Sequence, residues 1–282
     1  MSQLTQLFTG PGSQPADEDG AELSYMSMPS GMMTYAAQDL PEKEDMAGLD
    51  DGLSVLQSVL ETLRKGETDA ASNNAVSLSG LNAANLNLIN QVLGEGEVSV
   101  VAGEKIQAQE AVLAGVWRVR VTDENGELAH DLIEIGSFPR TVLDTAFEGA
   151  KEAIDIPQDF GPNVFNAPAL LPEINEHIPK ASPGAQPHVI NLSLLPHTEE
   201  DLGCLVELLG RGDITILSRG YGNCRITSTA THNVWWVQFY NSQDTLILNS
   251  IEITAMPEVA IAAPEDIADS ADRLTEILEV YR

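Results

Sequence analysis

The sequence predicts an α+β fold built from two homologous copies of a helix plus antiparallel-sheet module, related by a pseudo-twofold axis. A disordered acidic tail precedes them. Three observations predict this: the two halves of the chain align with each other, short strands alternate with glycine-rich turns, and the first 50 residues lack apolar periodicity. Short strands joined by turns, with helices on one side, make an α+β fold, and paired copies usually pack about a twofold axis.

The tail, residues 1–50, is expected to be disordered because it is rich in Ser, Gly, Pro, Asp and Glu and buries too little apolar surface to fold. It includes SYMSMPSGMMTY, residues 24–35, with four methionines and two tyrosines. Methionine adapts to varied apolar surfaces. The tail is therefore predicted either to dock on a partner or to fold back on its own domain, through Met26, Met28, Met32 and Met33.

The rest of the chain reads as a duplication. An offset of 116 residues carries residues 75–100 onto residues 191–216, with similar residues at most steps. After an insertion of two residues, an offset of 118 carries residues 116–135 onto residues 234–253. Long blocks that align with so few gaps predict an internal repeat.

The two modules are predicted to span residues 51–160 and 161–282, the second including a C-terminal helix. Each module opens with a helix and a short strand. A second helix then starts at an Asn or Thr N-cap and ends at a glycine, which takes the left-handed conformation at low cost. Three or four strands with turn signals follow. The predicted caps are Asn82 and Gly94 in the first module, and Thr198 and Gly210 in the second.

Two adjacent tryptophans, Trp235 and Trp236, point to opposite faces of their predicted strand. Trp235 aligns with Trp117, so this face is the core in both modules. Trp236 aligns with Arg118, where the first module is polar. A large aromatic side chain there indicates that the second face is covered, by the other module, a helix or a partner, and Tyr240 lies on the same side.

The loop SRGYGNCRITS, residues 218–228, gathers Arg219, Cys224 and Arg225 in an otherwise acidic chain and also holds Tyr221. Two nearby arginines would lower the pKa of a thiol and favour the reactive thiolate. The alternatives are a contact loop and a plain hairpin turn. We expect this loop to contact a partner.

Composition excludes several classes of function. The formal charge of −29 argues against nucleic acid or an anionic membrane as partner and favours a basic protein segment. No apolar stretch approaches the roughly 20 residues of a membrane span, and the start lacks the features of a secretory signal. Neither the two cysteines nor the five histidines show metal-ligand spacing. We expect a cytoplasmic protein with no catalytic site, metal or cofactor.

The motifs VLGEGEVSV, GVWRVR and NAPALLPEI, with the long block from ILSRGYGNCRITST to PEVAIAAPEDIADS, resemble the HupH/HyaF family of hydrogenase expression/formation proteins. The resemblance implies a non-enzymatic maturation factor, a chaperone that binds the immature small subunit of an uptake [NiFe]-hydrogenase before export. Other maturation proteins are further implied partners. The family supplies no catalytic or metal site to carry over.

Two alternatives stay open: a thiol-dependent redox or iron–sulfur-handling protein that acts through Cys224, and a scaffold for other maturation factors. The residues predicted to contact the partner are Trp236, Tyr240, Arg219, Tyr221, Cys224 and Arg225, with the four methionines of the tail.

Overall fold

A computed structural model describes residues 47–65, 74–220 and 222–281 of the protein. The predicted disordered tail, including its four methionines, lies outside these residues except for its last four positions, and so does Tyr221.

The described chain forms six α-helices, three short 3-10 helices and ten strands. In chain order they are α1 (Asp50–Lys65), β1 (Ala75–Ser77), α2 (Ala83–Leu93), β2 (Val98–Ala102), β3 (Ile106–Glu110), β4 (Val116–Thr122), β5 (Leu128–Ile135), α3 (Arg140–Leu143), α4 (Ala167–His177), η2 (Ile178–Lys180), β6 (His188–Asn191), η3 (Leu192–Leu194), α5 (Glu199–Leu209), β7 (Ile214–Ser218), β8 (Asn223–Ser228), β9 (Val234–Tyr240), β10 (Leu246–Ile253), η4 (Glu258–Ala260) and α6 (Pro264–Val280).

All ten strands belong to one antiparallel sheet, in the order β1-β5-β4-β3-β2-β7-β8-β9-β10-β6. At its centre β2 pairs with β7, and Val100 lies opposite Ile216. These two residues are separated by the 116 positions of the sequence offset. Outward from this junction the strands are β3, β4, β5 and β1 on one side and β8, β9, β10 and β6 on the other. The predicted α+β class with antiparallel pairing is confirmed.

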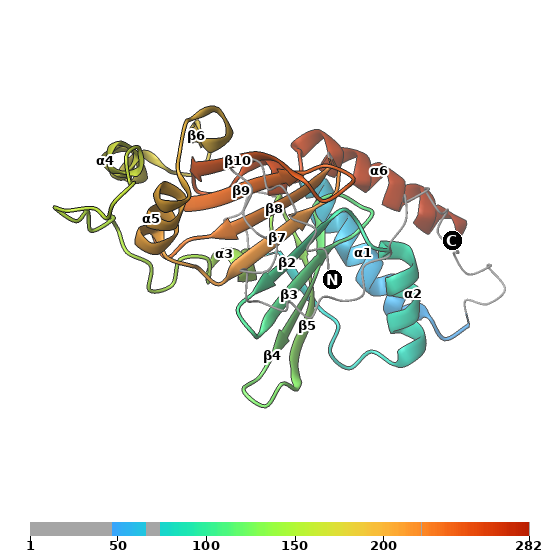
Figure 1. Ribbon diagram of the computed structural model, residues 1–282. Coiled ribbons are helices and arrows are strands. Elements are labelled where there is room, and N and C mark those ends of the chain that lie inside the picture. The colour runs from blue at the N-terminus through green and yellow to red at the C-terminus, as the bar shows by residue number, and fades with distance from the viewer. Residues whose placement is uncertain (1–46, 66–73, 221, 282) are drawn as a thin grey trace, which may run out of the picture.

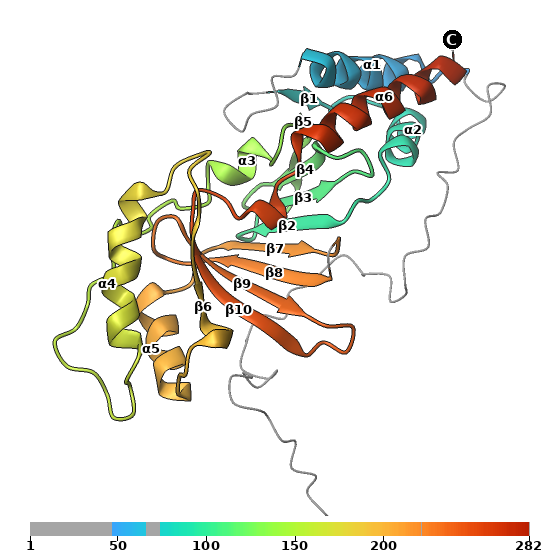
Figure 2. The ribbon, with the colours of Figure 1, turned by 90° about the horizontal axis from the view of Figure 1, so that it is seen from above.

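The helices form two groups at opposite ends of the sheet (Figures 1 and 2). The first half of the sheet consists of β1 to β5 and the second half of β6 to β10. Helices α1, α2 and α6 pack on the first half in one apolar core, and α4 and α5 pack on the second half in another. Both groups cover the same face of the sheet, the outer face, which carries Val116 and Val234. The other, inner face has its own core, which runs through both halves and includes Trp117, Trp235 and residues of α3 and η4.

Helix α6 follows the second half in sequence but packs against α1 of the first half. Its apolar side chains Ile267, Leu274 and Leu278 are buried there. Figure 2 shows α1 and α6 side by side above the strands of the first half. The C-terminal helix, which the sequence places with the second module, thus completes the core of the first.

The predicted helix caps are confirmed. The side chain of Asn82 accepts a hydrogen bond at the start of α2, and Thr198 forms a capping box with Asp201 at the start of α5. Gly94 and Gly210 end these helices with φ of 55° and 67°, values that glycine adopts without a Cβ penalty. These features are local, which is why the sequence pattern could place them.

The two adjacent tryptophans lie on opposite faces, as predicted. Trp117 and Trp235 are fully buried in the inner core, and their Nε1 atoms donate to the carbonyls of Gly136 at 3.0 Å and Thr254 at 3.1 Å. Trp236 is only 8% exposed, because it is buried with residues of α4 and α5 in the other core. The prediction that Trp236 contacts a partner is therefore corrected: the helices of its own half cover it.

Candidate functional site

Among the residues that the structure describes, no helix packs on the outer face of the central strands. Between the two helical groups most outward side chains of β2, β3, β4, β7, β8 and β9 are partly or fully exposed, whereas Thr215 and Trp236 are buried. We call this surface the open sheet face. Its members are Ser99, Val101, Gln107, Gln109, Arg118, Arg120, Leu217, Arg225, Thr227 and Gln238.

The register places these side chains in two rows that cross the strands. One row runs Arg118, Gln109, Ser99, Leu217, Arg225 and Gln238, each residue paired with the next. The second row runs Arg120, Gln107, Val101, Thr215 and Thr227. Amide, hydroxyl and guanidinium groups dominate both rows, so the face suits hydrogen bonding more than apolar contact.

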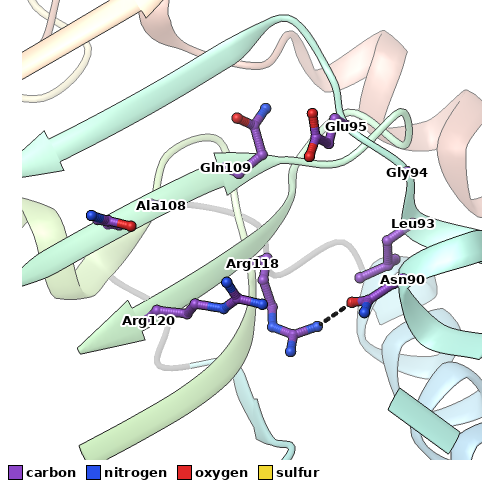
Figure 3. Close-up of a pocket in the computed structure, with 9 residues that line it drawn as sticks. Asn90, Leu93, Gly94, Glu95, Ala108, Gln109, Arg118 and Arg120 are labelled. Carbon is purple, nitrogen blue, oxygen red and sulfur yellow. Dashed lines mark hydrogen bonds between the residues drawn. The ribbon is translucent and has the colours of Figure 1, made fainter. Parts of the chain in front are cut away.

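A hollow of about 270 Å³ opens at one end of this face, beside the last turn of α2. Figure 3 shows its side chains, which come from α2 and the turn after it, from β3 and from β4. They are Asn90, Leu93, Gly94, Glu95, Gln107, Ala108, Gln109, Arg118 and Arg120.

Arg118 has a structural role at the floor of the hollow. Two of its nitrogens donate to the two carboxylate oxygens of Asp131, and a third donates to Asn90 Oδ1 at 3.0 Å. Its side chain is 13% exposed. The guanidinium thus ties β4 to β5 and to the end of α2, where a positive charge also suits the helix dipole.

Arg120 differs from Arg118 in its surroundings. Its side chain is 47% exposed, and its Nε lies 4.0 Å from Asp131 Oδ1, the oxygen already bound by Arg118. One carboxylate therefore serves two guanidinium groups. Arg120 thus has the longer of the two ion pairs, and about half of its side chain is exposed.

Gln109 is held in place at the upper edge of the hollow. Its Nε2 donates to the carbonyls of Gly96, Val98 and Glu110, each at 3.1 Å. The Gln109 side chain thus holds the start of β2 against the end of β3. Gln107, two positions earlier on β3, is exposed and points to the same side.

The predicted contact residues are only partly brought together. Arg225 and Tyr240 are partly exposed on the outer side, and the Tyr240 hydroxyl donates to Gln238 Oε1 at 3.2 Å. Arg219 follows β7, and its backbone N–H donates to the carbonyl of Glu97 at 3.2 Å. Arg120 was not among the predicted contacts, although its alternation with the valines of WRVRV was a signal for it.

The alternative of a reactive thiolate at Cys224 is contradicted by its surroundings. The side chain is 3% exposed and lies in the inner core, on the opposite side of β8 from Arg225. Burial, together with the negative charge of Glu252, raises the pKa of the Cys224 thiol to about 12. Adjacent strand residues face opposite ways, so the neighbouring guanidinium does not reach the sulfur.

Glu110 is a buried carboxyl group at the end of β3, with 8% of its surface exposed. Burial raises its pKa to about 7; the backbone N–H of Gly115 acts in the opposite direction, and the charges of Glu97 and Asp266 add to the rise. Raised pKa values mark candidate acid–base groups. Glu110, however, lines neither this hollow nor a second one formed between α1 and the end of α6.

Replacing Glu110 by Gln is expected to raise the free energy of unfolding at pH 8 by about 3 kcal/mol. Its carboxyl group titrates near 4.5 when unperturbed and near 7 in the fold. The stability contributed by the protonated form is fully present below pH 4.5 and is lost as the pH rises through 7. Urea unfolding at pH 4.5 and pH 8 measures the difference. The control variant Glu104→Gln, at an exposed position, should change stability little at either pH. An equal gain in stability for Glu110→Gln at both pH values would contradict the explanation.

Other kinds of site are not apparent in the part of the chain that the structure describes. No group of three or more His, Cys, Asp or Glu side chains is placed to hold a metal ion among those residues. Within the same ranges, no helix combines the length and apolar character needed to cross a bilayer.

Comparisons with known proteins give consistent results. A family model described as the C-terminal conserved region of the HupH hydrogenase expression protein matches residues 50–156 and 164–281. A hydrogenase expression/formation protein HoxQ from Cupriavidus necator is 46% identical over 97% of this chain and 95% of its own length. HupH from Rhodobacter capsulatus is 47% identical over 99% and 98%.

More distant matches carry related names. The hydrogenase-1 operon protein HyaF of Escherichia coli is 33% identical over 99% of this chain and 97% of its own length. A solved structure of a hydrogenase expression protein HupH from Thiobacillus denitrificans matches 40% of this chain and 95% of its own, with 31% identity and a TM-score of 0.38.

Proposed function

The chain belongs to the HupH/HyaF family of hydrogenase expression/formation proteins, and from this premise we propose that it is a non-catalytic maturation factor. It binds the immature small subunit of a [NiFe]-hydrogenase in the cytoplasm, before export, as a chaperone. The observation that carries the proposal is that four relatives, 41–47% identical over 96–99% of this chain, are named hydrogenase expression/formation proteins.

We also propose that the two halves are copies of one module related by a pseudo-twofold axis between β2 and β7. The strand order outward from this junction and the pairing of Val100 with Ile216 support it. The two stretches that match the family model fall one in each half. Pairing of β2 with β7 joins the two halves into one broad sheet, so neither strand is left as a free edge. The resulting surface is wide enough to bind a protein partner.

A binding role agrees with the chemistry of the described residues. Glu110, which has a strongly raised pKa, lies away from the hollow, and the Cys224 thiol is buried with its pKa near 12. The open sheet face instead offers many hydrogen-bonding groups across six strands. These features favour a protein that binds another protein over a thiol-dependent redox factor acting through Cys224.

The test is binding between two purified proteins. The full-length chain is mixed with the small-subunit precursor of the hydrogenase from the same operon, and the affinity is measured by calorimetry. We expect a one-to-one complex, with no binding to the mature, exported subunit. A second arm measures hydrogenase activity in a deletion strain, which should be lost and restored by the full-length gene.

Two outcomes would contradict the proposal. Normal hydrogenase maturation in the deletion strain would remove the need for this factor. Binding that occurs only when a third maturation protein is added would instead indicate a scaffold for other maturation factors, because a chaperone contacts its client directly.

A further inference from the structure

We infer that the open sheet face binds an acidic segment of the partner protein, with a carboxylate of that segment at Arg120. The inference rests on the proposed function, since it names the surface and the chemistry by which the client is held. It departs from the expectation from composition alone, which was a basic partner.

Arginines are concentrated on this face relative to the rest of the chain. The protein carries a formal charge of −29, with 14 basic residues against 43 acidic ones. Four of its nine arginines nevertheless lie on or beside the open sheet face: Arg118, Arg120, Arg219 and Arg225. A locally positive strip on a polyanion attracts a carboxylate-bearing segment to this place and repels it elsewhere, which gives orientation as well as affinity.

Three acids lie near these arginines: Asp131 and Glu95 at the hollow, and Glu97 beside Gly220 at the end of β7. Both carboxylate oxygens of Asp131 accept hydrogen bonds from Arg118, and Asp131 Oδ1 lies 4.0 Å from Nε of Arg120. In Figure 3 the carboxylate of Glu95 lies beside Gln109, apart from both guanidinium groups in the hollow. Of the two guanidinium groups in the hollow, that of Arg120 is therefore the more exposed to an incoming carboxylate.

The dimensions of the face suit a single segment of protein chain. Six neighbouring strands, β4 to β9, span about 24 Å at about 4.8 Å per strand. A helix with its side chains is about 10–12 Å wide, and an extended strand is narrower. Either is narrower than the span of these strands.

Side chains on both sides of the hollow complete the polar contacts. Gln107, exposed and next to Arg120 in the second row, offers an amide that can donate to a second carboxylate oxygen or to the segment's backbone. Gln238 and Arg225 end the first row on the far side. The segment is thus expected to cross the strands, with acidic residues at its Arg120 end.

The test compares Arg120→Glu with Arg140→Glu in the full-length protein. Arg140 lies on α3, on the inner side of the sheet. Its side chain is 44% exposed, close to the 47% of Arg120, and the change from Arg to Glu alters the net charge equally in both variants. With the purified small-subunit precursor as probe, we expect Arg120→Glu to weaken binding by about tenfold or more and Arg140→Glu to leave it within about twofold. Thermal unfolding should be nearly the same for both variants.

Two further measurements identify the partner segment. Hydrogen–deuterium exchange of the wild-type complex should show protection in β3, β4, β7 and β8 and in an acidic segment of the precursor. Changing the protected acids of that segment to Lys should restore binding to Arg120→Glu and weaken binding to the wild type.

The outcomes separate the two proposals. If the wild type binds the precursor but the two variants bind equally well, the acidic-segment inference is overturned and the chaperone function stands. If the wild type does not bind the precursor, both fall. If Arg120→Glu instead abolishes a dimer of this chain, the face is an interface between copies, and the inference is again overturned.

Discussion

Replacing Asp201 by Ala is expected to lower the free energy of unfolding by about 3–5 kcal/mol. The carboxylate is 1% exposed and serves two helix N-termini at once. Its Oδ1 accepts the N–H groups of Phe165, Asn166 and Ala167 at 2.8–2.9 Å, at the start of α4. Its Oδ2 accepts the N–H of Thr198 at 3.1 Å, at the N-cap of α5. Alanine would leave these donors without their acceptor in a site from which water is largely excluded.

The direction of the Asp201 pKa agrees with this explanation. Burial acts to raise the pKa, but the four backbone N–H groups outweigh it, so the pKa ends below its ordinary value of 3.8. A lowered pKa in the fold means that the stabilisation is present above pH 3.8 and is lost as the pH falls through the folded value. The variant should therefore differ most from the wild type near neutral pH.

Urea unfolding at pH 7 measures the cost of the Asp201 change. Asp201→Asn keeps one acceptor oxygen without the charge and should cost less than Asp201→Ala. Asn85, 116 positions earlier in the sequence, is an amide at the start of α2: its Oδ1 accepts the N–H of Gly52 in α1 at 2.6 Å. A loss below about 1 kcal/mol for Asp201→Ala would show that water replaces the carboxylate, contrary to this explanation.

Trp236→Ala is the second large effect, with an expected cost of about 3–5 kcal/mol. The indole fills the core between the second half of the sheet and α4 and α5, together with Val234 and Ile251. Its Nε1 donates to Asn249 Oδ1 at 2.5 Å. Truncation would leave a cavity and an unpaired amide oxygen, both of which destabilise a closely packed core.

Two matched variants separate packing from contact. Trp236→Phe keeps most of the volume and should cost less than Ala, while Tyr240→Ala removes a partly exposed ring on the same side of β9 and should cost about 1 kcal/mol. Chemical unfolding and binding to the small-subunit precursor are measured for each. If Trp236→Ala kept its stability but lost the partner, the indole would be a contact residue after all.

Several features of the fold could be predicted because they depend on neighbours in sequence. The alternation in VWWVQF separates Trp235 from Trp236, and the caps at Thr198 and Gly210 require only local hydrogen bonds and a permissive backbone. The alignment of the halves matched α2 with α5 and the strands that follow each of these helices. The family could also be identified from these motifs.

The site was less accessible to sequence reasoning. Arg219, Cys224 and Arg225 are close in the chain, yet β8 turns the thiol into the inner core and the guanidinium of Arg225 to the outer face. Arg120 lies across three strands from Leu217, and nothing in the local pattern joins them. Nearness in sequence was therefore a poor guide to nearness in space.

By itself, the sequence determined the α+β class, the strands and capped helices, and membership of a family of hydrogenase expression/formation proteins. Only the tertiary structure decided that helices cover Trp236, that α6 returns to the first half, and that arginines from distant strands share one open face. The physical reason is the range of the forces involved. Backbone preference and side-chain alternation act over a few residues, whereas burial and charge depend on which strands the sheet brings together.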